Sequence, residues 1–140
     1  MNSLNKWALS AMLLTACITN AQADESASML SGAQEVPAVT SNANGKSTII
    51  IGADRSVRGS VKTTGITGTA AHIHMGSKDE SGPVVIALNG STAHNKWTVP
   101  KGAMLTEEQF AAYKAGKLYV NVHSAAHKDG EIRAQLLPLQ

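Results

Sequence analysis

The sequence predicts an all-β domain, an antiparallel β-sandwich or barrel, with one short helix. Gly, Ser and Thr interrupt the chain roughly every ten residues, and short apolar or alternating runs lie between them. The loop 41–45 and the tripeptide 53–55 have the composition of turns. Strands are predicted over residues 29–36, 46–52, 56–64, 70–75, 84–88, 96–99, 117–124 and 131–137, with a polar loop over 89–95.

A single helix is predicted after Thr106. Thr106 is a typical N-cap, and Gln109 completes a capping box three residues later. Phe110 and Tyr113 are spaced to lie on one helical face, and Gly116 stands where helices commonly end. We expect about ten residues of helix, packed over one end of the sheet.

Composition limits the classes of function. The chain has 140 residues, a length typical of one domain, and only 4% are aromatic, too few for a base-stacking platform. The formal charge is +2 and the basic residues are spread along the chain, so no nucleic-acid partner is expected. No apolar run is long enough for a mature transmembrane helix.

The N-terminal stretch is predicted to be an export signal. A weakly basic start is followed by the apolar run 7–16 and by the small-residue cleavage pattern Ala21-Gln22-Ala23. Cleavage there leaves one domain over residues 24–140, periplasmic or secreted. Alternatively, Leu14-Thr15-Ala16-Cys17 resembles a bacterial lipobox, in which Cys17 carries a lipid anchor. In both cases the protein leaves the cytoplasm.

Strand alternation groups several histidines on one face. In the strand over 70–75, His72 and His74 point to the same side. In the strand over 117–124, Tyr119, Asn121 and His123 point away from the apolar side chains of their strand. The turn signal Asp129-Gly130 predicts that this strand pairs with the next one.

If the strand over 70–75 lies beside that hairpin, His72, His74 and His123 converge as ligands of a metal ion. His127, close to the turn, is a candidate fourth ligand, and Met75 or a water is another. Asn121 or Glu131 would orient an imidazole through its other ring nitrogen.

The plainer alternative is that the histidines are hydrogen-bonded structural residues. His94 lies in a polar loop and is expected to be solvated. Glu131 and Arg133 either join a polar network with the histidines or belong to a solvated strand face, and the solvated face is the default expectation.

Five segments in order along the chain resemble the CHRD domain, a module first described in chordin and common in exported bacterial proteins. They are LSGAQEVP (30–37), AHIHMG (71–76), SGPVV (81–85), YVNVH (119–123) and GEIR (130–133). The resemblance implies an immunoglobulin-like or related β-sandwich. Stand-alone bacterial members are linked to metal handling, and the module has no single established activity. The chain lacks the cysteine-rich modules that accompany the domain in chordin, so growth-factor antagonism is not implied.

A second resemblance is local. The His-Ile-His-Met-Gly segment, a following Gly-Pro and a late Val-x-Val-His strand are similar to the copper ligands of Cu/Zn superoxide dismutase. A bridging histidine, a zinc-ligand cluster and the cysteines of that family's disulfide are not found. The likeness therefore supports a copper-type histidine site more than it supports dismutase activity.

These observations favour a non-enzymatic, exported metal-binding module, with copper preferred to zinc because copper(II) binds nitrogen ligands more tightly. Metal affinity should fall below about pH 6, where histidines become protonated. A second hypothesis is an adhesive or scaffold domain that contacts a protein partner or self-associates. A third is a copper redox enzyme. Hydrolase chemistry is not supported by any nucleophile motif.

Overall fold

The computed structural model describes residues 27–139. The export signal predicted for residues 1–23, and the alternative anchor at Cys17, lie outside the described residues. Within them, no helix is both long and apolar enough to cross a membrane.

The described chain forms antiparallel strands and one α-helix, as predicted. The strands are β1 (Ser28–Ser31), β2 (Asn44–Ser47), β3 (Ile50–Ile51), β4 (Val57–Arg58), β5 (Ser60–Thr64), β6 (Gly68–Met75), β7 (Val84–Ala87), β8 (Asn89–Gly90), β9 (Lys96–Thr98), β10 (Leu118–Ser124) and β11 (Ile132–Leu136). The helix is α1 (Glu107–Lys114), and a short 3-10 helix, η1 (Gly32–Gln34), follows β1.

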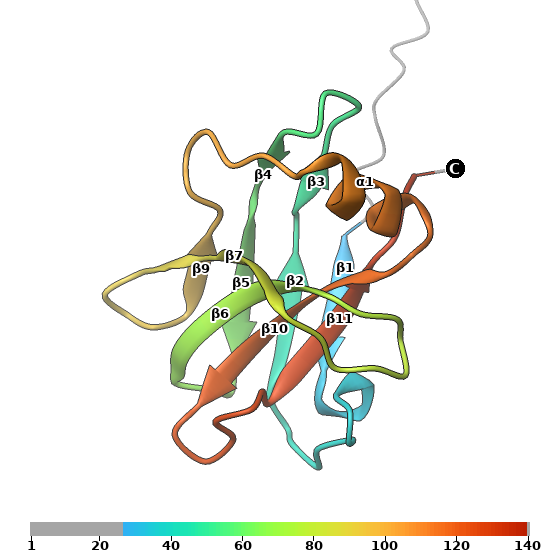
Figure 1. Ribbon diagram of the computed structural model, residues 1–140. Coiled ribbons are helices and arrows are strands. Elements are labelled where there is room, and N and C mark those ends of the chain that lie inside the picture. Colours follow the sequence, from blue (N-terminus) through green and yellow to red (C-terminus); the bar gives the residue numbers. More distant parts are fainter. Residues whose placement is uncertain (1–26, 140) are drawn as a thin grey trace, which may run out of the picture.

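Nine strands form one sheet, in the order β7-β6-β10-β11-β1-β2-β5-β9-β8, and β3 pairs with β4 separately. The sheet curls until its two edges nearly meet (Figure 1). Leu88 alone separates β7, at one edge, from β8, at the other, and its N–H donates to the Ala71 carbonyl in β6. The all-β, sandwich-like fold is confirmed, in a form close to a barrel.

Alternation along the strands places apolar side chains inside the curled sheet. Leu30, Val61, Ile73, Val120 and Ile132 are at most 1% exposed. Removing this apolar surface from water is the main stabilising contribution, at about 25 cal/mol per Å². Met75 packs against the same core, so it does not face the histidines.

Some predicted strands were too long. The strand expected over 29–36 ends at Ser31, where η1 begins, and the strand expected over 46–52 is divided between β2 and β3. The predicted strand 56–64 is likewise divided, between β4 and β5. Asn89 and Gly90, expected in a loop, form β8 because they complete the far edge of the sheet. These differences arise from pairing between strands that are distant in the sequence, and the alternation of residues along one strand does not reveal that pairing.

The helix has the predicted cap. The Thr106 hydroxyl accepts a hydrogen bond from the Gln109 N–H, and the Gln109 side-chain oxygen accepts one from the Thr106 N–H. Tyr113 is buried and Phe110 packs against the core. The helix lies at the same end of the curled sheet as β3 and β4 (Figure 1). The turn between β10 and β11 lies at the other end.

Candidate metal centre

The outer face of β6, β10 and β11 carries the predicted polar side chains. In the register of β6 with β10, His74 lies opposite Tyr119 and His72 lies opposite Asn121. Beyond them, Arg133 of β11 lies opposite Asn121. The predicted pairing of the His72–His74 strand with the hairpin is therefore confirmed.

His72, His74 and His123 come together on this face. Each offers one ring nitrogen, and these three nitrogens lie within 4.8 Å of one another. The Nδ1 of His72 is 3.0 Å from the Nε2 of His123, at hydrogen-bonding distance. His74 is buried, whereas His72 and His123 are partly exposed, so the cluster is open to solvent on one side.

Backbone carbonyls orient two of the three imidazoles. His123 donates from Nδ1 to the carbonyl of Lys128 at 2.7 Å, which leaves its Nε2 with a lone pair when the ring is neutral. His74 donates from Nδ1 to the carbonyl of Gly82 at 2.9 Å. An N–H···O=C bond from the second ring nitrogen is a common feature of metal-ligating histidines.

Asn121 contacts the other ring nitrogen of His74, Nε2. The Oδ1 of Asn121 lies 3.0 Å from the Nε2 of His74, and Asn121 is only 2% exposed. The contact suits a cationic His74. A neutral His74 that donates to Gly82 instead needs the amide turned, so that its NH2 group faces Nε2. In the structure Asn121 contacts His74 through Oδ1, and its NH2 group donates to the Asp129 carbonyl at 3.5 Å.

Burial favours the neutral form of His72 and His74. It lowers the pKa of His72 below its ordinary value, and the neighbouring His123 and His74 lower it further. Burial also lowers the pKa of His74 and outweighs its hydrogen bonds to Gly82 and Asn121, which act in the opposite direction. Neutral imidazole is the form that binds metal ions.

A stack of three side chains supports the cluster. The Tyr119 ring lies parallel to the His74 ring, with centroids 4.8 Å apart, and the Arg133 guanidinium carbon lies 3.5 Å from the Tyr119 ring centroid. Because β10 lies between β6 and β11, Tyr119 is held between an imidazole and a guanidinium. Stacking of this kind restricts the rotation of His74.

The loop between β6 and β7 covers the stack. Arg133 donates to the carbonyls of Glu80 and Ser77, at 2.9 and 2.7 Å, and the Tyr119 hydroxyl accepts from the Gly82 N–H. A side chain at Gly82 would collide with the Met75 carbonyl, so glycine allows the loop to approach β6. The expectation that Arg133 is solvated is wrong. It is 1% exposed, because the loop shields it from water.

The other predicted site residues lie differently. His127 is in the turn after β10 and is not a member of the three-histidine cluster, while His94 is exposed. Glu131 accepts a hydrogen bond from the Ser41 hydroxyl at 2.6 Å, which directs it toward the loop before β2. Its predicted role behind a ligating imidazole stays a prediction.

The sequence analysis did not identify Glu35, which is buried near Arg133 and Asn121. Glu35 is 7% exposed, and its Oε1 has no hydrogen-bond partner among the described residues. Burial raises the pKa of Glu35 to about 7, although Arg133 and a hydrogen bond with Asn121 act to lower it. The sequence signal was weak, since Glu35 directly follows the short helix η1, in a stretch that was predicted to be strand.

The fold and site together define a curled all-β domain with a histidine cluster on its outer face. The family model for the CHRD domain matches residues 26–136, and the chain belongs to this family. Comparison with curated proteins and with solved structures gave no match.

Proposed function

We propose that this protein binds one divalent transition-metal ion through His72, His74 and His123, with copper preferred to zinc. The observation that carries the proposal is the gathering of three ring nitrogens within 4.8 Å from two strands far apart in the sequence. The proposed role is metal handling outside the cytoplasm, in the periplasm or in secreted form. The signal-like residues 1–23 support that location.

The spacing of His72 and His123 suits a shared ion. Metal–nitrogen bonds near 2.0–2.1 Å place two ligating nitrogens about 2.9–3.4 Å apart, for angles between square and tetrahedral. The Nδ1 of His72 and the Nε2 of His123 are 3.0 Å apart. An ion between them would replace the shared proton, and the bond from His123 to Lys128 would persist.

His74 would join as the third ligand through Nε2. Its Nδ1 can keep the bond to Gly82, while Nε2 exchanges the Asn121 amide for the ion. Asn121 would then bond to the ion's water or to Glu35, whose carboxyl group it already contacts. Water would fill the coordination positions on the open side of the cluster.

Copper is preferred for three reasons. Copper(II) binds nitrogen ligands more tightly than zinc does, and it favours tetragonal geometry with angles near a right angle. The short His72–His123 spacing corresponds to an angle near the lower end of the range above. An exported chain would also meet copper outside the reducing cytoplasm.

A second candidate function follows from the hydrogen bonds of His74. Both of its ring nitrogens already have partners, which is typical of a structural histidine. In this account the cluster ties β6 to β10 and to the covering loop. The domain then acts through contact with a protein partner or with another copy of itself.

Calorimetric titration with copper(II) and with zinc separates the two candidates. We expect one equivalent of metal to bind, and His72→Ala or His123→Ala to weaken binding by about a hundredfold. His94→Ala is the matched control, because His94 is exposed and outside the cluster. His127→Ala tests the fourth predicted ligand. Equal affinity of wild type, His72→Ala and His123→Ala would contradict the proposal and favour the structural role.

A further inference from the structure

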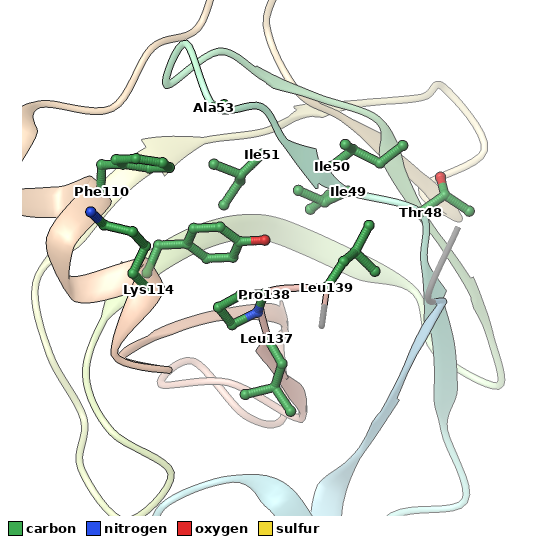
Figure 2. A pocket seen from close by; sticks show the side chains of 11 residues that line it. Thr48, Ile49, Ile50, Ile51, Ala53, Phe110, Lys114, Leu137, Pro138 and Leu139 are labelled. Atoms are coloured by element: carbon green, nitrogen blue, oxygen red, sulfur yellow. The ribbon is translucent and has the colours of Figure 1, made fainter. Parts of the chain in front are cut away.

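A cavity of about 380 Å³ lies between the β3 segment, α1 and the chain after β11. Its apolar lining includes Ile49, Ile50, Ile51, Phe110, Leu137 and Leu139. Figure 2 shows Ile51 directed toward Phe110 of the helix and Ile50 extending away from it, with Leu137 and Leu139 across from the isoleucines. None of the histidines of the metal cluster lines this cavity.

The cavity has the volume and the lining of a small-molecule site. Small-molecule sites typically enclose about 300–1,000 Å³ and are mostly apolar, with a few polar groups. Leu137 and Leu139 are 59% and 56% exposed although both are large and apolar. Covering this apolar surface with an apolar molecule is favourable, because the surface is otherwise left in water.

One charged side chain lines the cavity, and it is a cation. The Lys114 ammonium lies 5.0 Å from the centroid of the Phe110 ring, beside the apolar wall. Among residues 27–139, no carboxylate forms a salt bridge with Lys114. The hydroxyls of Thr48 and Tyr113 are the remaining polar groups of the lining side chains. Within the described part of the chain, the arrangement thus combines an apolar volume with one positive charge that forms no salt bridge.

We propose that this cavity binds an amphiphile with one aliphatic chain and an anionic head group, such as a long-chain carboxylate. The chain occupies the volume between the isoleucines and Phe110, and the carboxylate lies at Lys114. A neutral or cationic head group would lose the attraction to the ammonium. The site is independent of the metal centre, so either proposal can fail alone.

The other occupant to be tested is the chain's own N-terminal segment. Ser28, at the start of β1, pairs with Ser47, the residue before the cavity-lining Thr48. The described chain therefore begins close to the cavity, and the residues that precede it in the sequence include the apolar run 7–16. Occupation by this segment would exclude an amphiphile.

The test titrates the protein as it is produced with dodecanoate, dodecanol and dodecyltrimethylammonium, followed by calorimetry and by methyl NMR shifts of the isoleucines. We expect one equivalent of dodecanoate to bind more tightly than either analogue. Lys114→Gln should weaken dodecanoate about three- to fivefold and leave dodecanol unchanged. Lys101→Gln, at an exposed lysine outside the lining, is the matched control.

Leu139→Asp tests the apolar wall at an exposed position, where the fold does not depend on the side chain. It should abolish binding of dodecanoate and of dodecanol, while Leu139→Met retains both. The proposal is overturned if dodecanoate does not bind, or if Leu139→Asp leaves its affinity unchanged. Equal affinity for the trimethylammonium analogue would also overturn it. So would contacts between residues 1–26 and Ile50 in the ligand-free protein, because the segment itself would then be the occupant.

Discussion

The Nδ1 atom of His72 lies 3.0 Å from the Nε2 atom of His123, although 51 positions separate these residues in the chain. The antiparallel register of β6 with β10 places His72 opposite Asn121, two residues before His123. A diagonal neighbour across two strands is within reach of a long or aromatic side chain. The contact therefore depends on this register, and a slip of one residue would turn the histidines to opposite faces.

Asn121 should be the most important polar residue behind the histidines. Asn121→Ala removes the partner of the His74 Nε2 and leaves buried polar groups unsatisfied, so we expect a loss of about 2–3 kcal/mol in the free energy of unfolding. Urea denaturation measures the change. Asn44→Ala is the control, because the exposed side chain of Asn44 accepts a hydrogen bond from the Thr64 hydroxyl at the surface, and the change should cost less than about 0.5 kcal/mol. Equal losses in the two variants would show that Asn121 does not hold His74.

Glu35 should make the protein less stable as pH rises. Its pKa is about 7 in the folded protein, against 4.5 for the ordinary side chain. Between these two values the unfolded chain releases a proton that the folded chain retains, so stability falls as pH increases through this range. Glu35→Gln removes the effect, and at pH 8 it should be more stable than wild type by up to about 3 kcal/mol.

The histidines act in the opposite sense, because the lowered pKa values of His72 and His74 reduce stability as pH falls below 6.5. The quantity to compare is therefore the difference in the free energy of unfolding between Glu35→Gln and wild type. It is measured by urea denaturation at pH 5 and at pH 8. Glu108→Gln, at an exposed position, should show no such pH-dependent difference. A constant difference between Glu35→Gln and wild type would mean that Glu35 is ionised in the folded protein at all these pH values.

Three lysines spread through the sequence form a row across the sheet. Lys62 lies opposite Lys46 on one side and opposite Lys96 on the other, and all three are exposed. Like charges in directly opposed positions repel each other, so Lys62→Glu should raise the free energy of unfolding by about 0.5–1 kcal/mol.

The gain should shrink in high salt, because salt screens exposed charges. Thermal denaturation at low and high ionic strength checks this, with Lys62→Gln separating the loss of repulsion from the new attraction. Lys101→Glu is the control for a general change in net charge. Unchanged or lower stability in Lys62→Glu at low salt would show that the row carries no repulsive cost.

Much of the polar face could be predicted from strand periodicity. Alternation grouped His72 with His74, and the Asp129-Gly130 turn paired β10 with β11, as the structure has them. The helix and its cap were predicted because capping depends on residues only three positions apart. Local signals were sufficient wherever the determining contacts are local.

The cover over the polar face could not be predicted in the same way. The burial of Arg133 and Glu35 results from the loop between β6 and β7 and from the segment after β1, which meet where Ser81 bonds to the Val36 carbonyl. Periodicity describes which face a residue occupies, and it does not show whether a distant loop covers that face. The bonds of His74 to Gly82 and of His123 to Lys128 also involve loop residues, whose positions strand periodicity does not predict.

The most direct test of the metal centre is electron paramagnetic resonance of the protein loaded with one equivalent of copper(II). We expect hyperfine coupling from coordinated imidazole nitrogens, which is reduced in His123→Ala and His72→Ala and unchanged in His94→Ala. A copper spectrum without imidazole coupling in the wild type, or one that is identical in His123→Ala, would contradict ligation by the histidine cluster.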